Sequence, residues 1–231
     1  NDTARSITGV GFQPDWVWLK VRSAGSGQDH TLYDVIRGAT KFLEANTQNA
    51  EATGSNYLTA FNSDGFTLGN DQSHVNANSD TYVSWNWKAG GSASSNSDGT
   101  ITSSVSANTT AGFSIVSYTG TGSNASVGHG LGVKPAWFIV KRRGAVEDWA
   151  VYHQSMTASH YINLNTTNAK DSNNRWNGEP DTSVLNFQSH AAVNGSSDTY
   201  ISYCFAEKKG YSKFGSYTGN GNAEGPFIHL G

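Results

Sequence analysis

Gly11–Lys20 reads GFQPDWVWLK, and a related stretch, GVKPAWFIVK, returns at Gly132–Lys141. In both stretches a proline precedes a continuous apolar run, which predicts an extended entry into a buried strand. A repeated stretch of this length indicates an internal duplication, which predicts further matching blocks in the two halves of the chain.

Three further blocks recur in the same order and with similar gaps. Because all of them keep their order, we interpret the chain as two diverged copies of one unit. The first member of each pair lies in the N-terminal half and the second in the C-terminal half: Asp29–Asp34 with Asp148–His153, Asn46–Ala50 with Asn165–Ala169, and Ser79–Trp85 with Ser197–Tyr203.

A fifth pair, Phe113–Gly122 and Phe214–Gly221, recurs with a different phase. If this segment opens each unit, the first unit lacks it and a third unit is cut short. If it closes each unit, the chain holds two complete units, residues 1–122 and 123–231, and we favour this division. Residues 90–112, rich in Ser, Asn and Gly, are then a linker or a peripheral hairpin. The end, Gly225–Gly231, resembles the approach to another core strand, so we expect a longer natural polypeptide.

The composition favours short strands over helices. Only 14% of the 231 residues are charged, 26 are Gly, and 7 Trp, 10 Tyr and 10 Phe can fill a sandwich core. We therefore predict an all-β fold of two tandem antiparallel β-sandwich domains.

Charge and cysteine content argue against several classes of protein. The formal net charge is −3, and no basic run exceeds Arg142–Arg143, so we expect no nucleic-acid binding. No apolar stretch is long enough to insert into a membrane. Cys204 is the single cysteine, which excludes an intrachain disulfide, so stability must come from core size or from assembly.

The chain resembles a repeat domain of tail fibre and other virion structural proteins of tailed phages. That resemblance implies a concanavalin-like, jelly-roll sandwich, and it implies a fibre or appendage module rather than a particular chemistry. It is carried by Gly11–Lys20, Tyr33–Gly38, Ser63–Phe66, Ser79–Gly90, Gly128–Gly132 and Gly210–Gly221.

An enzyme that degrades polysaccharide is the alternative to a binding module. A retaining glycosidase needs two carboxylates about 5 Å apart, which predicts an acid-x-acid pattern inside a strand. The expected strands contain no such pattern, and Glu147-Asp148 falls in an expected turn. We therefore expect no enzyme, with a glycosidase or a lyase built from His, Tyr and Arg as the minority reading.

Two tryptophans are the candidates for sugar binding, because an exposed ring can pack on the C–H face of a sugar. Trp149 has His30 as its repeat counterpart, and Trp176 lies in the polar loop 173–177 without an aromatic counterpart. The candidate glycan-binding set is Trp149, His153, Arg175, Trp176 and Asn177. Trp16, Trp18, Trp85 and Trp137 lie in expected strands and are assigned to the core.

No metal site is expected from histidine, since no short His-x-His or His-x3-His spacing occurs. Calcium is the weaker alternative. Asp64, Asp71 and Asp98 lie in loops with Asn and Gly neighbours that offer oxygen ligands, although the same residues are typical of β-turns. We expect no cofactor apart from this calcium candidate.

The resemblance implies a location at the virion surface or in another extracellular setting, and a host cell-surface glycan as the partner. We also expect contacts with other virion proteins and a homo-oligomer, with a trimer as the favoured state. The alternative is a purely structural repeat that spaces a fibre or decorates a capsid and contacts no ligand.

Overall fold

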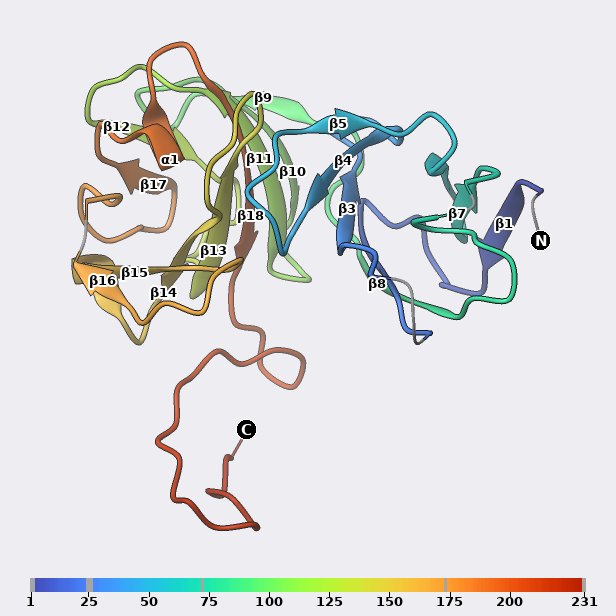
Figure 1. Ribbon diagram of the computed structural model, residues 1–231. Coiled ribbons are helices and arrows are strands. Elements are labelled where there is room, and N and C mark those ends of the chain that lie inside the picture. The colour runs from blue at the N-terminus through green and yellow to red at the C-terminus, as the bar shows by residue number, and fades with distance from the viewer. Residues whose placement is uncertain (1–2, 24–26, 72, 173, 230–231) are drawn as a thin grey trace.

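The computed structural model describes residues 3–23, 27–71, 73–172 and 174–229, and regular structure in these residues is almost entirely β-strand (Figure 1). All pairings between named strands are antiparallel, as expected for this all-β chain. Two short helices complete the described elements, η1 (Thr157–Ser159) and α1 (Ala191–Asn194). Within the described ranges, no helix has the length and hydropathy needed to cross a membrane.

The N-terminal part, residues 3–89, forms two sheets with the orders β5-β4-β3-β2-β8 and β1-β7-β6. Side chains alternate along β2, so Val17 and Leu19 point into the core between these sheets while Trp16 points the other way. The strands are β1 (Arg5–Thr8), β2 (Trp16–Val21), β3 (Thr31–Asp34), β4 (Lys41–Glu44), β5 (Ala52–Thr53), β6 (Leu58–Asn62), β7 (Gly65–Leu68) and β8 (Tyr82–Trp87).

The C-terminal part, residues 94–206, forms an eight-stranded sheet of order β16-β15-β14-β13-β18-β11-β10-β9 and a two-stranded sheet of β12 and β17. Phe138, Tyr200 and Phe187 belong to the core between these sheets. The strands are β9 (Ser94–Asn96), β10 (Ser103–Asn108), β11 (Phe113–Thr119), β12 (Ala125–Gly128), β13 (Trp137–Arg142), β14 (Ala150–His153), β15 (His160–Asn163), β16 (Asp171–Ser172), β17 (Val184–Phe187) and β18 (Thr199–Phe205).

The two parts share one strand order. β5-β4-β3-β2-β8 corresponds to β16-β15-β14-β13-β18, and the pair β1–β7 corresponds to β12–β17. The repeated sequence blocks lie on these corresponding strands: Gly11–Lys20 leads into β2 and Gly132–Lys141 into β13. The C-terminal part differs by continuing from β18 into β11, β10 and β9.

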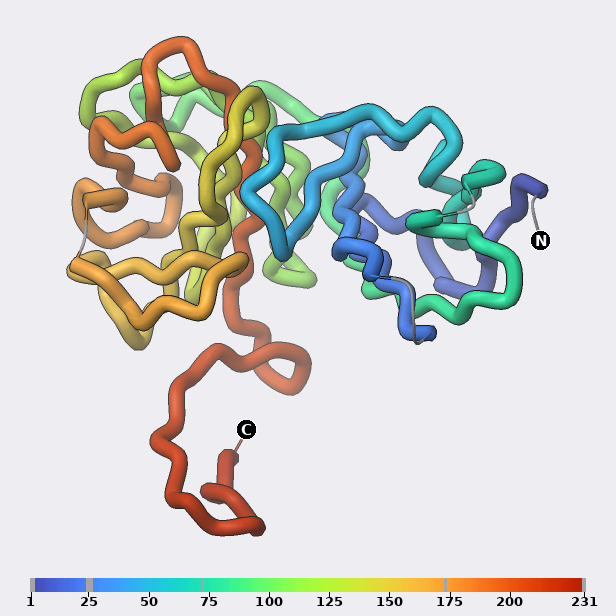
Figure 2. Tube along the Cα trace, in the orientation of Figure 1, coloured from blue at the N-terminus to red at the C-terminus, as the bar shows by residue number. Residues whose placement is uncertain are grey.

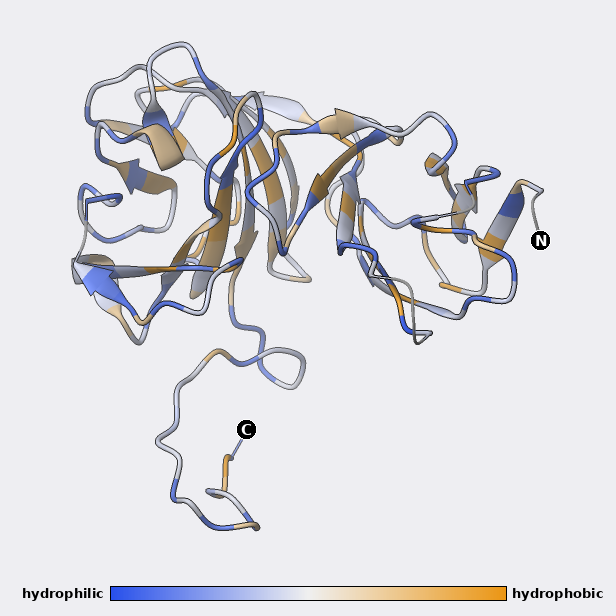
Figure 3. Ribbon diagram, in the orientation of Figure 1, coloured by the Kyte–Doolittle hydropathy of each residue, from blue (hydrophilic) through white to orange (hydrophobic). Residues whose placement is uncertain are grey.

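The two large sheets pack face to face and bury a further core between them. Trp16 of β2 stacks on Tyr203 of β18 with ring centroids 4.4 Å apart, and Trp16, Trp149 and Tyr203 are fully buried. Hydrophobic residues recur along the strands of these sheets (Figure 3). A continuous buried face of this kind joins the two parts into one packed body.

Strand pairing corrects the expected boundary near residue 122. Phe113–Thr119, expected to close the first unit, forms β11 and pairs with β18 along its whole length, so it belongs to the C-terminal part. Within residues 90–112, β9 and β10 pair as a hairpin at the edge of the eight-stranded sheet, which favours the hairpin alternative over a linker.

The segment after β18 extends away from the sheets (Figure 2). Lys208 and Ser212 form an isolated bridge, and none of residues 213–229 belongs to a strand. Tyr217 and Phe227 in this segment are 70% and 89% exposed. The last two residues of the Gly225–Gly231 stretch lie outside the described residues.

Candidate functional site

Trp149, the first candidate for sugar stacking, is fully buried between the two large sheets. Its indole Nε1 donates a hydrogen bond to the backbone carbonyl of Glu44 at 2.9 Å, which links the residue preceding β14 to β4 of the other sheet. The prediction of an exposed ring is therefore wrong. The ring is buried because the second large sheet covers this face of the first.

Trp176 is 1% exposed and lies in the core on the opposite face of the eight-stranded sheet. Its Nε1 donates to the carbonyl of His160 at 3.0 Å, and its ring meets Phe138 edge-on at 5.0 Å. The prediction that Trp176 presents a ring to a sugar is also wrong. The polar neighbours of Trp176 in the sequence indicate an exposed loop, but the loop folds back and places the indole in the core. Asn173, at the start of that loop, lies outside the described residues.

The other three candidates do not converge on a common patch. The guanidinium of Arg175 lies over the ring of Tyr161 at 4.3 Å from its centroid, and Arg175 as a residue is only 7% exposed. Asn177 is exposed and contacts Asn124 through its side chain. His153 lies at the end of β14, where its Nδ1 accepts a hydrogen bond from a nearby backbone N–H.

The carboxylates of the three calcium candidates accept hydrogen bonds from groups of the chain itself. Asp64 accepts from the backbone N–H groups of Gly9 and Gly11, and these bonds lower its pKa. Asp71 accepts from three successive backbone N–H groups after it, and Asp98 accepts from the side chain of Asn96. Among residues that the structure describes, no group of three or more His, Cys, Asp or Glu is placed to hold a metal ion.

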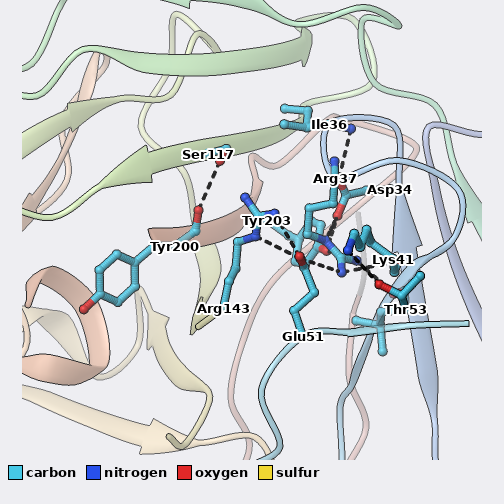
Figure 4. A network of polar contacts seen from close by, with 11 residues as sticks. Asp34, Ile36, Arg37, Lys41, Glu51, Thr53, Ser117, Arg143, Tyr200 and Tyr203 are labelled. Carbon is cyan, nitrogen blue, oxygen red and sulfur yellow. Dashed lines mark hydrogen bonds and ion pairs between the residues drawn. The ribbon is translucent and has the colours of Figure 1, made fainter. Parts of the chain in front are cut away.

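A buried ionic network joins the two parts at their junction (Figure 4). Arg37 Nε binds Asp34 at 2.5 Å, and the hydroxyl of Tyr203 donates to the same carboxylate at 2.7 Å. Arg143 forms a bidentate ion pair with Glu51, in which its Nε and one terminal nitrogen donate to the two carboxylate oxygens at 2.9 and 3.0 Å. Burial alone would lower the pKa of Arg37, but Asp34 raises it above its usual range. The side chains of Asp34 and Arg37 are wholly shielded from solvent, whereas those of Arg143 and Glu51 are 22% and 13% exposed, so the centre of the network lies inside the junction.

Lys141 lies in the same junction and is fully buried. Its Nζ donates to the backbone carbonyls of Gln48 at 3.0 Å and Glu147 at 2.7 Å, so it also links the two parts. Burial lowers the pKa of its ammonium group to about 8.

A partly exposed aromatic pair lies at the edge of the five-stranded sheet. Trp85 on β8 is 45% exposed and meets Trp18 edge-on, with ring centroids 6.0 Å apart. The Nε1 of Trp18 donates to Nδ1 of His30 at 2.9 Å, which fixes the half-buried indole. Burial, followed by the charge of Lys20, lowers the pKa of His30 and favours the neutral ring that accepts this bond.

A groove of about 310 Å³ runs from Trp18 to the loop after β15. Polar side chains of Asn46, Asn165 and Thr166 line it beside the ring of Trp18, so it combines an aromatic wall with hydrogen-bonding groups from both parts.

The assignment of Trp85 to the core was wrong, because β8 is an edge strand and the facing sheet does not cover this position. Trp16, by contrast, lies in the core as predicted. A signal for this surface was available in the sequence: Trp18 has the aliphatic Ile139 as its repeat counterpart, so only the first copy carries two aromatic residues at this pair of positions.

The family that matches the chain is described as a domain of unknown function (DUF7483), and the match covers residues 1–231. No curated protein and no solved structure shows significant similarity to the chain.

Proposed function

The chain belongs to the DUF7483 family, and we propose that it is a non-enzymatic module of a virion surface appendage, comparable to a tail fibre domain, that binds host-surface polysaccharide. The proposal includes a duplicated, concanavalin-like sandwich as its architecture. The shared strand order of the two parts and the sequence blocks on corresponding strands support that duplication.

The exposed indole of Trp85, in contact with the half-buried Trp18 that lines the polar groove, is the observation that carries sugar binding. A sugar ring packs its C–H face on an indole face, and amide and hydroxyl side chains then bind its hydroxyl groups. Trp85 supplies the exposed indole, and Asn46 and Asn165 line the groove near Trp18. Each amide makes two hydrogen bonds within the chain and keeps one N–H and one oxygen lone pair for a sugar hydroxyl. The site draws on both parts of the chain, so it depends on their packing. It replaces the set built on Trp149 and Trp176.

Binding to an array of bacterial surface polysaccharides tests this proposal. Trp85→Ala is the test variant, and Tyr211→Ala is the matched control, because Tyr211 is also an exposed aromatic residue, at 72%, but lies in the C-terminal segment. We expect Trp85→Ala to weaken binding about tenfold or more, as loss of a central aromatic contact does, and Tyr211→Ala to bind as wild type. Equal binding by wild type and Trp85→Ala would exclude the site.

A purely structural repeat is the second candidate, and the buried junction favours it. The stacked pair Trp16–Tyr203 and the buried Lys141 hold the two parts in one orientation, as a spacer in a fibre requires. Absence of wild-type binding to any array polysaccharide, with an intact fold, would favour this candidate over the first.

A further inference from the structure

The C-terminal segment repeats the sequence of a core strand without being paired as one. Ser216–Gly221 reads SYTGNG, and Ser117–Gly122 reads SYTGTG. Ser117 to Thr119 form the end of β11, in the middle of the eight-stranded sheet, whereas Tyr217 is 70% exposed and unpaired with any described strand. The segment therefore carries the sequence of an interior strand on a solvent-exposed chain.

The N-terminal part has an open edge where the C-terminal part holds β11. In the eight-stranded sheet, β18 pairs with β13 on one side and β11 on the other. β8 corresponds to β18 and pairs with β2, and its second side has no partner strand among the described residues. An open edge of this kind presents unpaired backbone donors and acceptors to another strand.

A groove of about 570 Å³ lies beside this open edge. In the C-terminal part the corresponding place is occupied by Tyr118 of β11. The ring of Tyr118 stacks on Phe187 at 5.4 Å and on Tyr200 at 5.1 Å, and its hydroxyl donates to the carbonyl of Val193 at 2.6 Å.

The counterparts of these three Tyr118 contacts all line the groove. Tyr82 corresponds to Tyr200 within the repeated Ser79–Trp85 block. Leu68 lies on β7 opposite β1, as Phe187 lies on β17 opposite β12, and Val75 precedes Asn76 as Val193 precedes Asn194. Leu68, Val75 and Tyr82 therefore form a site with the arrangement that holds a tyrosine in the other part.

The turn before β8 has the backbone conformation of its counterpart. Ser79 and Ser197 both adopt a left-handed conformation, with φ of 68° and 62°. Next to Ser197, the N–H of Gly120 donates to the carbonyl of Asp198 at 2.8 Å. A Cβ at Gly120 would lie 2.3 Å from the carbonyl oxygen of Gly195, so only glycine fits there.

The C-terminal segment keeps this glycine. Gly219 corresponds to Gly120, although a Cβ at Gly219 would meet nothing within 4 Å. Gly221 corresponds to Gly122, and both have a left-handed conformation, with φ of 67° and 73°. Nothing around Gly219 in the isolated chain requires glycine, whereas a place beside β8 would require it.

We propose that Ser216–Gly221 of a second copy of this chain adds as a strand to the outer edge of β8 and places Tyr217 in the groove lined by Leu68, Val75 and Tyr82. Each chain offers such a segment and such an edge at different places, so the contact is head-to-tail and builds rings or open chains of subunits. The groove that receives Tyr217 shares no lining residue with the groove beside Trp18. Both surfaces adjoin β8, because Ser216 would lie opposite Val83, two residues from Trp85.

Light scattering or sedimentation of the full chain over a range of concentrations tests the association. We expect wild type to form concentration-dependent assemblies, and Tyr217→Ala to weaken association about 30-fold or more, as loss of a buried anchor does. Gly219→Ala should weaken association without changing the thermal midpoint of unfolding, because a methyl group there meets nothing in the isolated chain. Tyr211→Ala should associate as wild type.

Cross-linking tests the register. Ser117 lies opposite Ile201 in the β11–β18 pair, so Ser216 should lie opposite Val83 of the neighbouring copy. A mixture of Ser216→Cys and Val83→Cys chains should form a mixed disulfide. A mixture of Ser216→Cys and Ser84→Cys should not, because adjacent side chains on β8 point to opposite faces. A wild type that stays monomeric, association that Tyr217→Ala leaves unchanged, or equal cross-linking of both mixtures would overturn the proposal.

Discussion

The indole of Trp149 donates its hydrogen bond to the backbone carbonyl of Glu44 at 2.9 Å, and this contact crosses from one large sheet to the other. It is one of several polar contacts at the junction, with the Arg143–Glu51 pair and the Lys141 bonds. Because a shared apolar core and these bonds hold the parts together, the two parts should unfold as a unit.

Trp149→Phe should lower the free energy of unfolding by about 1–3 kcal/mol, because the Glu44 carbonyl loses its donor in a buried place. Trp85→Phe is the control and should change it by about 0.5 kcal/mol or less, since Trp85 is 45% exposed. Urea unfolding followed by fluorescence and by circular dichroism measures both. Two separate wild-type transitions would contradict the shared junction.

Arg37→Met should lower the free energy of unfolding by about 3–5 kcal/mol, because Asp34 would be left as a buried and uncompensated charge. Arg142→Met is a suitable control. Arg142 pairs with Asp198 at 2.7 Å, but both side chains are 24% exposed, so the loss should be about 1 kcal/mol or less. Equal losses in the two variants would show that the buried network adds nothing to the junction.

The lowered pKa of buried Lys141 predicts that the free energy of unfolding rises with pH. Its pKa is about 8 in the folded chain against 10.5 for the free group, so the unfolded chain binds more protons between these values and the free energy of unfolding increases with pH. The increase is limited to about 3 kcal/mol. Lys141→Met should not show this increase. In urea unfolding between pH 8 and 9.5, the free energy of unfolding of wild type should therefore rise relative to that of the variant. Parallel curves for the two proteins would refute the buried ammonium.

The hydrogen bond from Trp18 to the neutral ring of His30 predicts weaker polysaccharide binding at acidic pH. The folded chain lowers the pKa of His30 below its usual 6.5 through burial and the charge of Lys20, with Asp29 opposing. Neutral His30 thus adds stability that is fully present above pH 6.5 and is lost as the pH falls through the lowered pKa. A protonated ring cannot accept the Trp18 N–H, so the indole loses its anchor.

Affinity measured between pH 7 and pH 5 checks this dependence. Wild type should lose affinity over this range, whereas His30→Gln, whose amide oxygen can accept the same bond, should show a smaller change. A similar loss in both proteins would assign the effect to other groups.

The sequence blocks that recur predicted the repeated strands well, because apolar runs after a proline and aromatic alternation are local features. Gly11–Lys20 and Gly132–Lys141 lead into corresponding strands, and Trp16 is buried as expected. The packing of the two large sheets on each other was not predictable in this way. A continuous apolar run such as Trp137–Lys141 indicates that both faces of a strand are buried, but it does not identify what covers the second face.

The candidate site depends on that packing, which explains the errors. Trp149 is covered by a sheet from the other part, and Trp176 lies in a loop that folds back on its own core. Trp85 and Tyr203 occupy the same position in the repeat, yet one lies on an edge strand and is 45% exposed while the other is fully buried. Sequence alone does not distinguish an edge strand from a central one in two copies of one pattern.

In the proposed function, polysaccharide binds at the aromatic pair Trp18–Trp85 beside the junction groove. A structure of the full chain with the oligosaccharide that it binds most tightly tests this claim most directly. We predict a sugar ring stacked on Trp85 at about 4 Å, with its hydroxyl groups toward Asn46 and Asn165. An oligosaccharide bound elsewhere on the chain, with Trp85 left free, would contradict the claim.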